Sequence, residues 1–208
     1  MKTLLLMAVR SKALLYLVMA LPGWELFWAL ASGDRYHAEM MYVSGVYSVY
    51  LLVLTLAVTP ISLLAARFQS TLPIARWLVE RRRDFGLGSF GYALMHMVHY
   101  LVETGDLVEA AYQAMDFDLA IGWLGFLIMT ILAATSNQAA RRALGRNWKQ
   151  LHRLIYTGAI FIVLHWLLFA FRPYEAITWA IILAAVKFIH AGLRVARTQV
   201  RKNKPATV

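Results

Sequence analysis

Six histidines are the residues of this sequence best suited to metal or redox chemistry: His37, His96, His99, His152, His165 and His190. The chain has no cysteine, which excludes disulfides, thiolate-ligated zinc or iron–sulfur clusters, and covalent attachment of haem through a CxxCH motif. A metal ion in this protein must therefore be held by histidine, methionine or carboxylate side chains.

His96 and His165 are predicted to lie at the same depth in two membrane-spanning helices. Each stands seven residues before a charged helix end, at Glu103 and Arg172, which places both rings about 10 Å below the outer boundary. Two imidazoles at one depth on neighbouring helices suit bis-histidine ligation of a non-covalent haem, and a filled iron coordination shell suits electron transfer. The alternative is hydrogen bonding between helices. His99 is predicted to share the face of His96 and to hydrogen-bond a haem propionate.

His152 could bind a second haem, nearer the cytoplasmic face of the membrane. It precedes His165 by thirteen residues, which is about 20 Å along a helix and about 220° of rotation beyond whole turns. The two rings would face different sides unless Gly158 changes the course of the helix between them or the helix begins late, near Arg153. The third span offers Arg82 rather than a lower histidine, and His190 is the spare histidine at that level. A haem-ligand role and a hydrogen-bonding role for His152 both stay open.

The composition indicates that membrane-spanning helices must position these histidines. Hydrophobic residues make up 61% of the 208-residue chain and charged residues 15%, with a mean hydropathy of +0.58; both proportions indicate a membrane protein rather than a soluble domain. Six apolar stretches are long enough to cross a hydrocarbon core of about 30 Å, and they lie at 13–31, 42–66, 85–103, 119–136, 154–171 and 175–193. The predicted fold is an all-α, six-helix membrane bundle, with a cytoplasmic N-terminus at 1–12, a transmembrane domain at 13–193 and a basic cytoplasmic tail at 194–208.

The net charge of +10 follows from topology. Eighteen of the 21 lysines and arginines fall in loops on one side of the predicted bundle, so the positive-inside rule places both termini in the cytoplasm. The opposite loop between spans three and four is acidic, with Glu103, Asp106, Glu109, Asp116 and Asp118. Nucleic-acid binding is not indicated. We expect the first span to be retained rather than cleaved as a signal peptide, because its apolar stretch is longer than a signal h-region.

Four segments of the sequence resemble the haem-binding transmembrane domain of ferric-reductase-like proteins, and the MsrQ family is the most similar within that superfamily. The segments are FGYALMH at 90–96, TSNQA at 135–139, LGRNWKQLHRLIY at 144–156, and His165-Trp166. His96, His152 and His165 match the histidines that are haem-associated in the family. His37, His99 and His190 match no such position.

The resemblance implies a b-type cytochrome in the bacterial inner membrane. It implies that electrons come from the quinone pool or a reduced flavin, delivered by quinol or a cytosolic flavin reductase, and leave to a periplasmic molybdopterin-containing methionine-sulfoxide reductase. The chain would then be an electron-transfer subunit that supports repair of oxidised periplasmic proteins, not the catalytic reductase. Family members are also described as binding FMN, although no motif in this sequence locates a flavin.

Two other functional classes fit the sequence less well. A six-span transporter or proton pathway could use the intramembrane histidines with Glu25 and Lys187, but only Pro22-Gly23 and Pro60 interrupt the spans, and no paired broken helices are predicted. An intramembrane serine protease would need a GxSxG or GxSG element, and the sequence before Ser89 lacks both.

Overall fold

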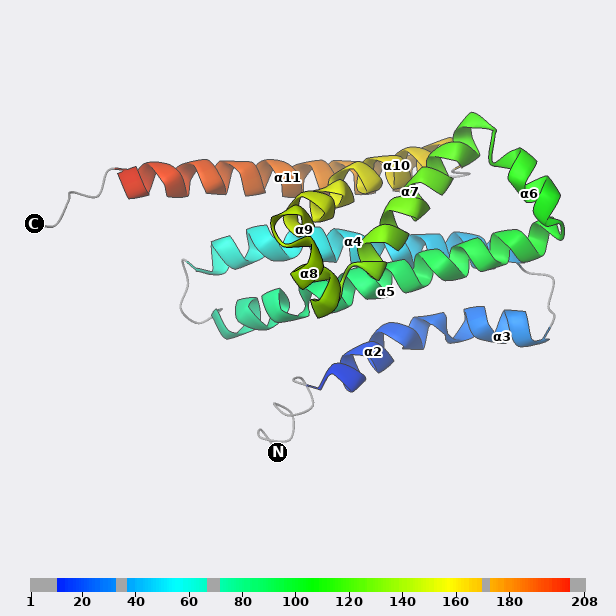
Figure 1. The fold of residues 1–208 in the computed structure, drawn as a ribbon, viewed down its shortest axis with the longest axis horizontal. Coiled ribbons are helices and arrows are strands. Elements are labelled where there is room, and N and C mark those ends of the chain that lie inside the picture. The colour runs from blue at the N-terminus through cyan, green and yellow to red at the C-terminus, as the bar shows by residue number, and fades with distance from the viewer. Residues whose placement is uncertain (1–10, 33–36, 67–71, 170–172, 203–208) are drawn as a thin grey trace, which may run out of the picture.

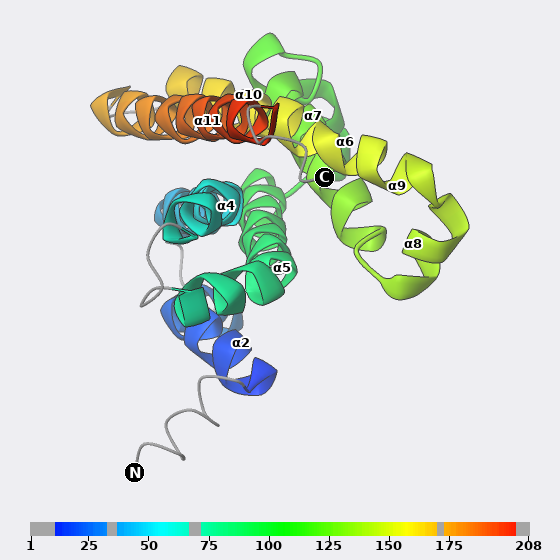
Figure 2. The same ribbon diagram turned by 90° about the vertical axis from the view of Figure 1, so that its left-hand side faces the viewer.

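The computed structural model describes residues 11–32, 37–66, 72–169 and 173–202, and the regular secondary structure in these ranges is entirely helical. The predicted all-α class is confirmed. The long helices run roughly parallel or antiparallel along the longest dimension of the molecule (Figure 1). Viewed along that dimension, α2 (Lys12–Ala20), α5 (Leu72–Thr104), α4 (His37–Ala65) and α11 (Pro173–Lys202) follow one another across the molecule (Figure 2).

The first apolar stretch is a broken helix. It consists of α2 (Lys12–Ala20), the 3-10 turn η1 (Leu21–Gly23) and α3 (Trp24–Ser32), and the break falls at Pro22, which has no N–H to donate. The hydroxyl of Tyr92, from α5, donates a hydrogen bond to the Met19 carbonyl at 2.5 Å. A broken helix in a membrane needs such partners for its backbone groups, so Tyr92 joins this break to the rest of the bundle.

Helices α4 (His37–Ala65) and α5 (Leu72–Thr104) form a long antiparallel pair. Ser48 and Ser89 lie buried where the two helices cross, and each hydroxyl donates to the other residue's backbone carbonyl, at 2.9 and 2.8 Å. Small residues allow helix backbones to approach closely in a membrane, where hydrogen bonds between helices add to the packing. This pair holds the helix that carries His96.

The second half of the chain packs against this pair. Its elements are α6 (Leu107–Gln113), α7 (Phe117–Ala134), α8 (Gln138–Leu144), α9 (Arg146–Leu151), η3 (His152–Leu154), α10 (Ile155–Phe169) and α11 (Pro173–Lys202). Helices α7 and α10 touch through two glycines: a Cβ added at Gly125 would lie 3.1 Å from Ile162, and one at Gly158 would lie 3.0 Å from Ile128. This contact positions the helix that carries His165.

Five helical segments in the described part of the chain are long and apolar enough to cross a membrane: Lys12–Ser32, His37–Ala65, Phe117–Ala134, Arg146–Phe169 and Pro173–Leu193. They agree with five of the six predicted stretches, and the protein is a multi-pass membrane protein. The remaining stretch, 85–103, lies inside the 33-residue helix α5. Histidines, glycines and a serine make this stretch less apolar than the others.

Charged residues that the sequence places in a loop continue helix α5 instead. Asp84 is 1% exposed; its Oδ1 accepts a hydrogen bond from the Tyr16 hydroxyl at 3.0 Å, and its Oδ2 lies 3.5 Å from Nη1 of Arg81. Arg82 donates to the carbonyl of Thr55 at 3.1 Å and to the hydroxyl of Thr59 at 3.0 Å. These contacts join α5 to α2 and α4 about three to four helical turns before His96.

Candidate haem site

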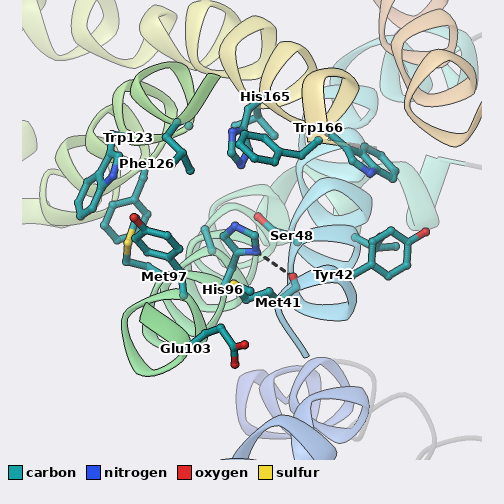
Figure 3. A pocket seen from close by; sticks show the side chains of 18 of the residues that line it. Met41, Tyr42, Ser48, His96, Met97, Glu103, Trp123, Phe126, His165 and Trp166 are labelled. Carbon is teal, nitrogen blue, oxygen red and sulfur yellow. Dashed lines mark hydrogen bonds between the residues drawn. The ribbon is translucent and has the colours of Figure 1, made fainter. Parts of the chain in front are cut away.

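A cavity of about 740 Å³ lies between α4, α5, α7 and α10. Its volume falls in the range typical of small-molecule and cofactor sites. The wall is largely aromatic and apolar, with Trp123, Phe126, Trp166 and Phe169 among its residues (Figure 3). His96 enters the cavity from α5 and His165 from α10, so this cavity is where the predicted ligand pair is found.

The imidazole rings of His96 and His165 lie opposite each other in this cavity (Figure 3). Their centroids are 6.2 Å apart and their planes are inclined at 87°. Two imidazoles bound to opposite sides of one metal ion have centroids about 6 Å apart, because each metal–nitrogen bond is about 2 Å long. The distance between the His96 and His165 rings therefore suits two histidines that bind the same haem iron.

Backbone carbonyls fix the protonation of both rings. Nδ1 of His96 lies 2.8 Å from the carbonyl oxygen of Met41, and Nδ1 of His165 lies 3.0 Å from that of Asp118. A carbonyl oxygen can only accept, so each Nδ1 carries the proton and each Nε2 keeps its lone pair. Among the described residues neither Nε2 has a hydrogen-bond partner, which leaves both nitrogens available to a metal ion.

One end of the cavity is polar and acidic. Glu103 and Thr104 from the end of α5, and Glu109 and Gln113 from α6, contribute to its wall. The Tyr100 hydroxyl donates to Oε1 of Gln113 at 3.0 Å, and Nε2 of Gln113 donates to Oε1 of Glu109 at 3.0 Å. This chain of hydrogen bonds fastens the short helix α6 beside the cavity at the end predicted to face outward.

Comparison with known proteins identifies the family. The family model described as a ferric reductase like transmembrane component matches residues 44–163, a range that includes His96 and ends two residues before His165. The protein from Cronobacter sakazakii named "Protein-methionine-sulfoxide reductase heme-binding subunit MsrQ" is 35% identical over 170 residues, covering 75% of this chain and 78% of that protein. This chain belongs to the MsrQ family.

Two further proteins of the MsrQ family, which carry the same name, are similar over most of their length. The protein from Ralstonia nicotianae is 33% identical over 178 residues, or 80% of this chain and 76% of that protein. The protein from Azospira oryzae is 31% identical over 204 residues, or 93% of this chain and 82% of that protein. The ferric-reductase-like membership expected from the sequence is therefore confirmed.

His152, the third histidine that the sequence resemblance associates with haem, lies outside this cavity. Its Nε2 is 3.2 Å from the hydroxyl of Thr135, and its ring stacks on Trp148 with centroids 4.0 Å apart and planes at 27°. His152 begins η3, and α10 begins only at Ile155. His152 thus contacts Thr135, the C-cap residue of α7, while His165 contacts Asp118 at the start of α7, despite a spacing that would separate their faces on an ideal helix.

A second histidine pair was not foreseen from the sequence. His99 is fully buried, and its Nδ1 lies 3.0 Å from Nδ1 of His37, with ring centroids 5.3 Å apart. His99 does not line the cavity of His96 and His165, so it is not in the position that bonding to a propionate there requires. The antiparallel order of α4 and α5 could have indicated this pair, because His37 begins one helix and His99 lies near the end of the other.

The charged residues of the transporter alternative also lie elsewhere. Neither Glu25 nor Lys187 contributes to the wall of this cavity. The ammonium nitrogen of Lys187, an exposed residue of α11, lies 3.2 Å from the centroid of the Tyr156 ring, which is a cation–π contact. The geometry of these two residues therefore gives no support to a shared ion pathway with the histidines.

Proposed function

We propose that this protein is a membrane b-type cytochrome in which His96 and His165 would hold one haem through their Nε2 nitrogens. The paired rings support this proposal most strongly: they lie 6.2 Å apart, and each is anchored through Nδ1 so that Nε2 is free. When bound, haem supplies a reversible one-electron iron couple. The aromatic wall would exclude water, and the two carbonyls would hold the rings in the ligating tautomer.

We propose that electrons enter from quinol or a cytosolic flavin reductase and leave to a periplasmic molybdopterin-containing methionine-sulfoxide reductase. The names of the relatives support the reductase system, because each is called the heme-binding subunit of a protein-methionine-sulfoxide reductase. The location would be the bacterial inner membrane. Helix α5 would be the third of six spans, both termini would be cytoplasmic, and FMN would be a second cofactor, as the family resemblance implies.

The visible spectrum of the purified protein tests the haem assignment. We expect a Soret band that shifts when dithionite reduces the iron, and a pyridine haemochrome of the b type, because the chain has no cysteine for covalent attachment. Protein purified from haem-supplemented cells in folded form but without a Soret band would refute the proposal. The same measurement separates a cytochrome from a transporter, which requires no chromophore.

The role of His152 can be decided by counting haems. A ligand role, which the family resemblance implies, predicts about two haems per chain, with His152→Ala removing about half of them. The hydrogen bond at Nε2 and the stacked Trp148 ring favour instead a role in fixing the start of α10. We therefore expect about one haem per chain, unchanged in His152→Ala, by haemochrome and protein assays. A ratio near two that falls by half in the variant would establish the ligand role.

A further inference from the structure

The two rings of the site are held by the same backbone arrangement on two different helices. The carbonyl that accepts from His96 belongs to Met41, and Gly45 follows it by four residues on α4. The carbonyl that accepts from His165 belongs to Asp118, and Gly122 follows it by four residues on α7. In both cases a glycine stands one helical turn after the carbonyl.

A glycine at this spacing exposes the carbonyl oxygen. In an α-helix the carbonyl of residue i bonds the N–H of residue i+4, which leaves the oxygen able to accept one further hydrogen bond. The side chain of residue i+4 leans toward the N-terminus and covers the preceding turn. When residue i+4 is glycine, that cover is missing and an imidazole ring can reach the oxygen from the side.

The rings occupy the space that a side chain would fill. A Cβ added at Gly122 would lie 2.7 Å from Nδ1, 2.8 Å from Cε1 and 3.0 Å from Cγ of His165, closer than real Cβ contacts. A Cβ added at Gly45 would lie 3.3 Å from Nδ1 and 3.6 Å from Cε1 of His96, a milder approach. Both glycines are therefore in direct contact with a ring, and Gly122 permits no substitution unless His165 moves.

We propose that Gly45 with the Met41 carbonyl, and Gly122 with the Asp118 carbonyl, are two matched seats that set the tautomer and the rotation of the axial ligands. The inference rests on the proposed haem role of His96 and His165. The two glycines are positioning residues: they act on the iron through the rings. Together the seats hold the ring planes at 87°, and ferric haem with perpendicular axial imidazoles gives a low-spin EPR signal of large anisotropy.

The seats also bear on the reduction potential. A hydrogen bond from Nδ1–H to a carbonyl makes the opposite nitrogen a stronger donor, which stabilises ferric over ferrous iron and lowers the potential. Displacing either ring from its carbonyl should therefore raise the potential. A raised potential distinguishes loss of these hydrogen bonds from general destabilisation of the bundle. General destabilisation lowers the haem content but does not require a raised potential in the haem that stays bound.

Alanine variants of the two glycines test the proposal on the full-length, haem-loaded protein. We expect Gly122→Ala to weaken haem binding by about tenfold or more, within the range of affinity loss found when a ligand's hydrogen-bond partner is lost, and therefore to lower the haem-to-protein ratio. Gly45→Ala, where the contact is milder, should retain haem with a raised midpoint potential and a changed EPR anisotropy. Gly91→Ala on α5 is the matched control, because a Cβ there meets no atom within 4 Å, and we expect wild-type haem content, EPR signal and potential.

Two results would overturn the proposal. The first is Gly122→Ala and Gly45→Ala proteins with wild-type haem content, EPR signal and potential; the second is a Gly91→Ala protein that changes as much as they do. Because Gly45→Ala is read from its potential and EPR signal, a folding defect in Gly122→Ala leaves the test intact. Haem properties that depend on His96 and His165 but not on the glycines would refute the role of Gly45 and Gly122 and leave the proposed function standing. Haem binding without those histidines would refute the proposed function itself.

Discussion

Replacing His96 or His165 by alanine is expected to remove haem from the purified protein, lowering the haem-to-protein ratio by more than about tenfold, since losing a ligand costs at least as much as losing its hydrogen-bond partner. The two rings are the nitrogen ligands that the structure brings to the cavity wall, so either change leaves one ligand and an empty space opposite. Absorbance at the Soret band relative to protein measures the loss, and the dithionite-reduced spectrum reports any residual haem.

The control for this prediction is His99→Ala. His99 lies on the same helix as His96, three residues later, but contacts His37 and stays outside the cavity wall. We expect this variant to keep its haem, and all three variants to insert into the membrane, because the apolar stretches are unchanged. Full haem content in both His96→Ala and His165→Ala would exclude the assignment of the axial ligands.

Much of this site could be predicted from the sequence because depth in a membrane follows from residue counts. Counting from His96 to Glu103 and from His165 to Arg172, which lies outside the described residues, predicts similar depths for the two histidines, and the structure brings their rings together at one cavity. The hydrogen-bond acceptors could not be predicted in the same way. The Met41 and Asp118 carbonyls belong to residues whose side-chain types carry no such information, and the contribution of Gly45 and Gly122 is the absence of a side chain.

The course of α5 shows why the inner end was harder to predict. Charged residues at 80–84 indicate a loop by hydropathy, yet the helix runs through them from Leu72. Asp84 is stabilised by Tyr16 from α2 and Arg82 by backbone and hydroxyl oxygens of α4. These partners are distant in sequence, so a hydropathy pattern cannot distinguish a buried polar contact from a solvated loop.

The proposed direction of electron transfer predicts that an oxidant that cannot cross the membrane oxidises the haem from one side only. His96 lies eight residues before the end of α5, which is about 12 Å along the helix, and His165 lies four residues before the end of α10, or about 6 Å. Both ligands therefore lie close to the end of the bundle that carries Glu103 and α6. The positive-inside rule predicts that this acidic end faces the periplasm, and in the proposed function electrons then leave the haem there.

Sealed vesicles of both orientations test this expectation. With the haem reduced beforehand, ferricyanide, which does not cross the membrane, should oxidise it rapidly in right-side-out vesicles and hardly at all in inside-out vesicles. Permeabilising the inside-out vesicles with detergent should restore fast oxidation, which shows that access and not the haem itself was limiting. Fast oxidation confined to intact inside-out vesicles would reverse the proposed direction. The outcome depends on the site lying near one end of the bundle, because a haem at the bilayer centre would be about as far from either face.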